Sequence, residues 1–389
     1  MLNMRYNFDA IISREGTDCY KYDGREHVFG RADVIPVWVA DMDFAVMPEI
    51  TEAMRRRLEH PIYGYTFRPE GFFDSVVQWV KRRNGWNIRR EWIDFTPGVV
   101  PGFAFGIRAF TKEGEGVLIQ PPVYHPFAGV TRDNGRTVVD NPLKEVDGRY
   151  EIDFADLDRK LSGAKVFLMC NPHNPTGRVF TKGELMEIGK LCVKHDVVIL
   201  ADEIHSDIIQ PPHKHIHIAS LSEEFAARTV TYIAPSKTFN LAALSTAVSI
   251  TSNKELFQRL HREYDTLHIG GGNVFGNIAL ETAYTHGDRW LDQMNAYIGG
   301  NMDYVIRFLG EKIPSVKCVK PEGTYMMWLD FRAWNKPHKE IVRFLIDRAG
   351  LGFNEGSMFG AGGEGFMRMN VATQRATVER AMNQLYEAI

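Results

Sequence analysis

Residues 166–203 read VFLMCNPHNPTGRVFTKGELMEIGKLCVKHDVVILADE, and this stretch decides the fold. Two short apolar runs, Val166–Cys170 and Val197–Ala201, predict strands that are buried on both faces of a sheet. Between them, Thr181 and Glu184 have the spacing of a capping box, which starts a helix ahead of an apolar period. Strand, helix and strand in this order predict two parallel strands joined by a crossover helix.

The same alternation extends along the chain on both sides of this stretch. Three more apolar runs predict strands at Val117–Gln120, Val230–Ala234 and Thr246–Thr251. Amphipathic patterns predict helices at 74–83, 254–264, 339–349 and after Thr373. After about residue 290 the alternation is less regular. We therefore expect an α/β fold, with a large domain built on a mostly parallel sheet flanked by helices, and a smaller α+β domain.

Composition excludes several classes of protein. The chain has 389 residues, and its 46 basic and 49 acidic side chains leave a net charge of −3, too balanced for a general nucleic-acid or anionic-lipid surface. No run approaches the roughly 18 apolar residues of a membrane helix. The four cysteines stand singly without a CxxC pair, so we expect no metal cluster and a reducing, cytoplasmic location.

Polar side chains follow three of the predicted strands. Asn174 lies between two Asn-Pro steps, Asp202 ends a fully apolar strand, and Lys237 follows another strand. Taken singly, these residues fit a turn, a helix cap and a solvated lysine. Together they match the needs of a pyridoxal phosphate site, in which a carboxylate keeps the pyridine nitrogen protonated and a lysine forms the Schiff base.

These motifs also resemble a known family. Asn-Pro-His-Asn-Pro-Thr-Gly, Asp-Glu, Ser-Lys-Thr-Phe and residues 366–370 resemble, in order and spacing, the fold-type I pyridoxal phosphate enzymes of the aminotransferase class I/II superfamily. Further stretches at 38–44, 63–66, 96–102 and 202–205 resemble its branch of MalY/PatB-type cystathionine β-lyases, which are C–S lyases. The resemblance runs from about Ile35 to the end of the chain.

The resemblance implies a role for individual residues. It makes Lys237 the Schiff-base lysine and Asp202 the partner of the pyridine nitrogen, with Tyr124 stacked on the ring as the third catalytic residue. Arg368 would bind the α-carboxylate of the substrate. Asn174 and Tyr65 would also contact the substrate. The remaining cofactor contacts would come from Gly98, Val99, Val100, Asn174, His205, Ser236 and, across a subunit boundary, Tyr65.

The resemblance also implies how the chain is organised. Residues 1–48 would contribute to the small domain, 49–288 would form the large cofactor domain, and 289–389 would form the small C-terminal domain. A homodimer would place the active sites at the subunit interface. The expected partners are a small amino-acid substrate and a second copy of the chain, with neither nucleic acid nor membrane.

The expected reaction is α,β-elimination from L-cystathionine or a related cysteine S-conjugate, yielding a thiol such as homocysteine, pyruvate and ammonia. One departure from the family bears on this expectation: Ser245 stands where many aminotransferases carry a phosphate-binding arginine, eight residues after the lysine. Two alternatives stay open, a pyridoxal phosphate-dependent aminotransferase and a protein that modulates transcription through a protein partner.

Two motifs resemble sites of other kinds. Residues 360–365 spell GxGxxG, but the strand-like run 366–371 follows them, whereas a dinucleotide site needs a helix there. His213, His215 and His217 alternate as metal ligands on a strand would. They adjoin Pro211 and Pro212, so we interpret this stretch as a loop and expect no metal.

Overall fold

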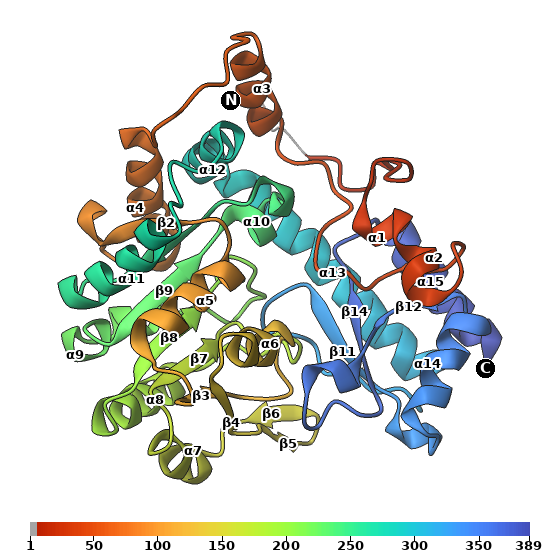
Figure 1. Cartoon of the computed structure of the whole chain (residues 1–389). Helices are drawn as coiled ribbons and strands as arrows, with labels where there is room; N and C mark the ends of the chain where they lie inside the picture. Colours follow the sequence, from red (N-terminus) through yellow and green to blue (C-terminus); the bar gives the residue numbers. More distant parts are fainter. Residues whose placement is uncertain (1–5) are drawn as a thin grey trace.

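A computed structural model describes residues 6–389 and contains a large sheet, a small three-stranded sheet and two pairs of strands (Figure 1). The large sheet has seven strands in the order β2-β10-β9-β8-β7-β3-β4. Its strands are β2 (Ile93–Thr96), β3 (Gly116–Ile119), β4 (Thr137–Asp140), β7 (Val166–Cys170), β8 (Val198–Asp202), β9 (Thr229–Ile233) and β10 (Ala247–Ile250). The five predicted runs are confirmed, and each of their boundaries agrees with the observed strand to within one residue.

The direction of the strands follows the expected pattern with one exception. From β9 to β4 all neighbouring strands are parallel, whereas β10 is antiparallel to both β9 and β2. Strands β2 and β4 are not among the predicted runs. β4 lies at one edge with its side chains half-buried or exposed, and β2 carries a charged Asp94, so neither has the continuous apolar run of a central strand.

Helices cover both faces of the large sheet (Figure 1). One face packs against α5 (Val99–Phe110), α6 (Pro126–Asp133) and α11 (Lys254–Thr266), and the other packs against α7 (Phe154–Leu161), α8 (Lys182–Lys194) and α9 (Glu223–Ala226). Along β7, side chains alternate between the two cores, because successive residues of a strand point to opposite faces. The capping box that begins α8 is confirmed: Thr181 accepts the N–H of Glu184, whose carboxylate accepts the N–H of Thr181.

The small sheet joins distant parts of the chain. Its order is β11-β14-β13, built from β11 (Met326–Asp330), β13 (Asn354–Glu355) and β14 (Phe366–Asn370), and β14 is the strand that follows the GxGxxG motif. Beside it, β1 (Ile35–Pro36) pairs in parallel with β12 (Leu351–Gly352). The N-terminal segment therefore lies against the C-terminal part, as the red and blue ribbons in Figure 1 show.

The remaining elements complete these two parts. The N-terminal segment carries two short helices, and a two-stranded hairpin borders the large sheet. The predicted domain boundaries at 48/49 and 288/289 stay a prediction. Within residues 6–389, none of the helices combines the length and the apolarity that a membrane crossing requires. The bounds are α1 (Tyr20–Asp23), α2 (Arg25–Phe29), α3 (Pro48–Leu58), α4 (Glu70–Asn84), β5 (Lys144–Val146), β6 (Arg149–Glu151), α10 (Pro235–Thr238), α12 (Val274–His286), α13 (Asp288–Lys312), α14 (His338–Asp347) and α15 (Arg375–Ala388).

A glycine lets α5 lie close to the sheet. A Cβ added at Gly102 would lie 2.6 Å from Cε1 and 2.8 Å from Cδ1 of Tyr232. The Tyr232 ring is fully buried and its hydroxyl donates to the Gly102 carbonyl at 3.0 Å, so the ring is held in place. The start of α5 is thereby fixed above the ends of β8 and β9.

We expect Gly102→Ala to destabilise the fold by about 1–3 kcal/mol, because the new methyl group overpacks the contact with Tyr232. Gly129→Ala is the matched control, since Gly129 is also helical and a Cβ there meets nothing within 4 Å. Helix propensity should make the control neutral or up to about 1 kcal/mol more stable. Urea unfolding of both variants measures the difference, and equal stabilities would contradict the close-packing argument.

Candidate active site

The ends of the parallel strands bring the predicted residues together. Cys170 pairs with Asp202, and Asp202 with Tyr232, so the carboxyl ends of β7, β8 and β9 are level. A cavity of about 190 Å³ opens there, where open α/β sheets bind their ligands. Nine of the predicted residues line it: Gly98, Val99, Val100, Tyr124, Asn174, Asp202, His205, Ser236 and Lys237.

Lys237 lies on the short helix α10, directly after β9. Its Nζ donates to the Ala40 carbonyl at 2.7 Å. Burial lowers the pKa of Lys237 to about 8, and the Arg368 cation adds to this, while Asp41 opposes it. The amine therefore loses its proton far more readily than an ordinary lysine does, as a nucleophile or general base requires.

Asp202 ends β8 and is 5% exposed. Its Oδ1 accepts the N–H of Ile204 at 3.2 Å, and burial raises the pKa of this carboxyl to about 7. Lys237 lowers the pKa and the Glu203 carboxylate raises it further. A buried acid with so high a pKa is poised to pair with a cationic group, and a protonated pyridine nitrogen is such a group.

Arg368 projects from β14 of the small sheet and is 3% exposed. Its guanidinium donates to Asn174 Oδ1 at 2.9 Å, to the Trp38 carbonyl at 3.1 Å and to Asn354 Oδ1 at 2.5 Å. Among the described residues its Nε has no hydrogen-bond partner and no carboxylate pairs with it, and burial lowers its pKa to about 10. A buried cation without a counter-anion fits a ligand that carries a carboxylate.

Two further side chains face the cavity in their neutral forms. Burial raises the pKa of the Tyr124 hydroxyl. Burial, together with the Lys237 and Arg368 cations, lowers the pKa of His205 to about 3. Within residues 6–389, His205 Nδ1 has no hydrogen-bond partner. This buried nitrogen can therefore bond to a ligand.

The start of α5 offers uncharged hydrogen-bond donors to an anion. Gly98, Val99 and Val100 open the helix, whose first N–H groups have no partner inside the helix, and Ser236 lies beside them. Among residues 6–389 no arginine lines this cavity, and Ser245 borders it at the position that departs from many aminotransferases. A phosphate would be held here by amides and hydroxyls.

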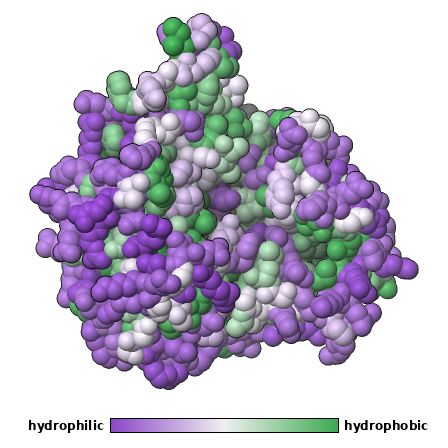
Figure 2. Space-filling view, viewed as in Figure 1, coloured by the Kyte–Doolittle hydropathy of each residue, from purple (hydrophilic) through white to green (hydrophobic). Residues whose placement is uncertain are grey.

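Tyr65 lies outside the cavity. Its side chain is fully exposed on the arm that joins α3 to α4, which also exposes Ile62, Tyr63 and Phe67. Figure 1 shows this arm projecting from the body, and Figure 2 shows apolar side chains on it. The predicted contact of Tyr65 with a phosphate therefore requires a second copy of the chain.

Three contributors were absent from the predicted site residues. Ala40 lines the cavity and accepts from Lys237, and the Tyr325 hydroxyl donates to the same carbonyl at 3.0 Å. Thr246 also borders the cavity. Ala40 lies in the stretch 38–44 that carries the family resemblance, but its role uses a backbone carbonyl, which no side-chain pattern reveals.

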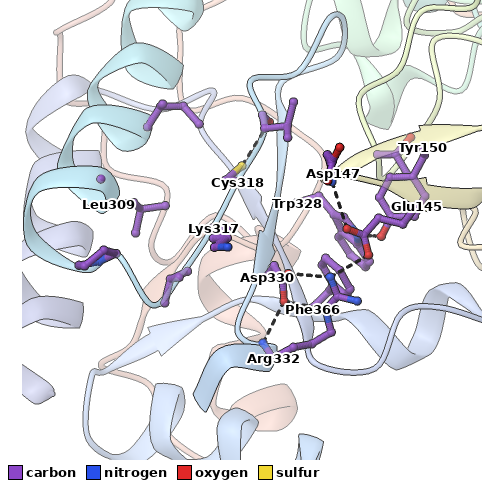
Figure 3. Close-up of a pocket in the computed structure, with 17 residues that line it drawn as sticks. Glu145, Asp147, Tyr150, Leu309, Lys317, Cys318, Trp328, Asp330, Arg332 and Phe366 are labelled. Atoms are coloured by element: carbon purple, nitrogen blue, oxygen red, sulfur yellow. Dashed lines mark hydrogen bonds and ion pairs between the residues drawn. The ribbon is translucent and has the colours of Figure 1, made fainter. Parts of the chain in front are cut away.

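A larger cavity of about 680 Å³ lies elsewhere, between the β5–β6 hairpin and β11 (Figure 3). Three of its charged groups pair with one another: Arg332 binds Asp330 at 2.8 Å and Glu145 at 2.7 Å. It contains none of the predicted residues. The smaller cavity therefore remains the candidate active site.

Comparisons with known proteins agree with this geometry. The family model described as aminotransferase class I and II matches residues 32–385. The chain is 41% identical to cystathionine beta-lyase PatB of Bacillus subtilis (strain 168) over 98% of this chain and 100% of that protein. The structure of a PLP-bound putative aminotransferase from Clostridium difficile 630 has a TM-score of 0.97 and 40% identity, covering 99% and 100% of the two chains. That of a PLP-bound C-S lyase from Staphylococcus hominis has a TM-score of 0.93 and 32% identity, covering 99% and 98%.

We expect Asp202→Asn to stabilise the cofactor-free chain at pH 8 by about 1–4 kcal/mol. A carboxyl whose pKa rises from 3.8 to about 7 on folding costs stability that accumulates between these two values as the pH rises. The gain should therefore shrink toward pH 5 and vanish below about pH 4. Urea unfolding at the three pH values measures it, and a gain that is independent of pH would contradict the assignment.

Proposed function

Since the chain belongs to the aminotransferase class I and II family, we propose that it is a pyridoxal phosphate-dependent C–S β-lyase. Its substrates are L-cystathionine or related cysteine S-conjugates, and its products are a thiol, pyruvate and ammonia. The observation that carries the proposal is the meeting of Lys237, Asp202 and Asn174 at level strand ends, with Arg368 bonded to Asn174. The names of PatB of Bacillus subtilis and of the Staphylococcus hominis C-S lyase favour elimination over transfer.

The residues present fit the cofactor. The Lys237 amine would bind it covalently, Asp202 would pair with the ring nitrogen, and Asn174 and His205 Nδ1 would bond its polar substituents. Tyr124 would cover the ring, and the start of α5 with Ser236 would hold the phosphate. When bound, pyridoxal phosphate supplies an electron-withdrawing ring that makes the α-proton of an attached amino acid acidic.

Substrate is held by the small sheet. Arg368 binds the α-carboxylate through its guanidinium, whose Nε has no partner among the described residues. Asn174, Asn354 and the Trp38 carbonyl fix the plane of this guanidinium. Because Asn174 lines the same cavity as Lys237, a carboxylate held by Arg368 would keep the substrate near the Lys237 amine.

Lys237 then moves the proton. Its pKa of about 8 lets the free amine take the α-proton, and the Ala40 carbonyl orients the amine by accepting one of its hydrogens. The Cβ–S bond breaks and its electron pair leaves with sulfur, which takes a proton from Lys237 or from Tyr124. Water hydrolyses the remaining three-carbon fragment to pyruvate and ammonia.

We further propose a homodimer with Tyr65 of each chain completing the site of the other. Tyr65, Phe67, Ile62 and Tyr63 expose apolar surface on one projecting arm. Exposed clusters of this kind mark interaction sites. No arginine of the described part of the chain lines the cavity, and a tyrosine hydroxyl from a partner would supply the phosphate with a further donor.

Incubation of the holoenzyme with L-cystathionine should release pyruvate and thiol in equal amounts without an added keto acid. Lys237→Ala should lose both turnover and the visible absorbance of the bound cofactor, because the covalent link and the base are the same amine. Turnover that depends on 2-oxoglutarate would instead identify an aminotransferase. A variant that kept colour and turnover would remove Lys237 from both roles.

The dimer is tested by light scattering after gel filtration, where we expect about twice the 44.3 kDa of one chain. Tyr65→Phe should keep this mass but lose the cofactor about tenfold more readily on dilution, because one hydrogen bond to the phosphate is gone. Tyr63→Phe on the same arm is the matched control. A monomeric wild-type protein, or equal cofactor affinity in the two variants, would overturn the shared site.

A further inference from the structure

Three buried side chains form a cluster on the side of β8 away from the cofactor cavity. Glu203 follows Asp202 at the end of the strand, and His215 and His217 lie in the loop before the 3-10 turn 218–220. His217 Nδ1 bonds to Glu203 Oε2, and His215 Nε2 lies 3.4 Å from the same oxygen. One atom from each of the three side chains lies within 4.8 Å of the others. The loop interpretation of this stretch is confirmed, but these two histidines are not at its surface.

The cluster leaves ring nitrogens without partners. His215 has no hydrogen bond at either nitrogen, and His217 has none at Nε2, among the described residues. Both side chains are at most 1% exposed, and Glu203 is fully buried. Buried polar atoms without partners are uncommon and point to a missing ligand. His215 Nε2 is the one of these atoms that faces Glu203, so a ligand between the two side chains would supply its missing partner.

The chemistry of the three groups suits a cation. Neutral imidazole and ionised carboxylate are the forms that bind transition metals. All three side chains are buried, and both histidines face the same carboxylate oxygen, Oε2 of Glu203. A buried carboxylate with two imidazoles beside it is therefore a donor set that a divalent cation can satisfy.

We propose that Glu203, His215 and His217 bind a divalent transition-metal ion, zinc being the ion that suits two imidazoles and a carboxylate. Ligands about 2.0–2.2 Å from a tetrahedral zinc lie a little over 3 Å apart, close to the 3.4 Å between His215 and Glu203. The ion replaces the hydrogen bond between His217 Nδ1 and Glu203, and the neutral ring then carries its one proton on Nε2. Water is the fourth ligand in zinc sites with three protein ligands.

The ion has a structural task that is separate from the proposed reaction. It ties the loop carrying the histidines to the end of β8, where Trp86 packs on His217 with ring centroids 4.7 Å apart. Glu203 is the chain neighbour of Asp202, so the ion also stiffens the strand end that presents Asp202 to the cavity. Metal content can therefore be tested whether or not the chain is a lyase.

The experiment uses the tag-free holoenzyme exposed to zinc chloride and freed of loose metal by gel filtration. Elemental analysis should find about one zinc per chain, and crystals should show a zinc-edge anomalous peak between the three side chains. His217→Gln and, separately, His215→Gln should lose the ion. His213→Gln, at an exposed position of the same loop, is the matched control and should keep it.

Two results would overturn the site. One is a wild-type protein without zinc above trace or with its anomalous peak elsewhere. The other is equal zinc in wild-type protein and in folded His217→Gln, since the cluster would then be a hydrogen-bonded ion pair only. If neither glutamine variant folds, the position of the anomalous peak in wild-type crystals decides. If the chain is a lyase but binds no zinc, the metal site is refuted and the proposed function stands.

Discussion

The segment from Trp38 to Phe44 is the constraint on which both parts of the molecule depend. It lies between the two sheets in extended and turn conformations, so its carbonyls cannot bond within a helix or a ladder. Each carbonyl instead accepts from a side chain. The donors are Arg368 for Trp38, Asn370 for Val39 and Asp41, Lys237 and Tyr325 for Ala40, Arg14 and Asn240 for Met42, Gln374 for Asp43, and Asn240 for Phe44.

These donors come from both sides of the active site. Lys237 and Asn240 belong to the large sheet's side, whereas Arg368 and Asn370 belong to β14, and Gln374 lies between β14 and α15. The segment therefore fixes the distance between the lysine that would move the proton and the arginine that would hold the carboxylate. Because a buried carbonyl without a donor costs about 1–3 kcal/mol, a shift of either part would be penalised at several residues at once.

The central strands and the side chains at their ends could be predicted from sequence. The features that could not be predicted lack a sequence signal, for physical reasons. The central strands β7, β8 and β9 are apolar on both faces, so their runs are visible, and the strand ends then predict Asn174, Asp202 and Lys237 together. The edge strands β2 and β4 lack that signal. The carbonyl of Ala40 has no residue type that would reveal it. Tyr65 was expected to reach across a subunit boundary, and in one chain its side chain lies in solvent.

Side chains alternate between the two faces of a β-strand, and this explains why two adjacent acids lie in different environments. Asp202 and Glu203 are adjacent acids at the end of β8, and successive side chains point to opposite faces. One carboxylate meets the cavity, where burial raises its pKa to about 7, and the other meets two histidines, which lower its pKa to about 2. The Glu203 charge raises the pKa of Asp202, so whatever neutralises Glu203 also makes Asp202 easier to ionise. A cation bound beside Glu203 would therefore favour the charged form of Asp202, the acid that would hold the cofactor ring protonated.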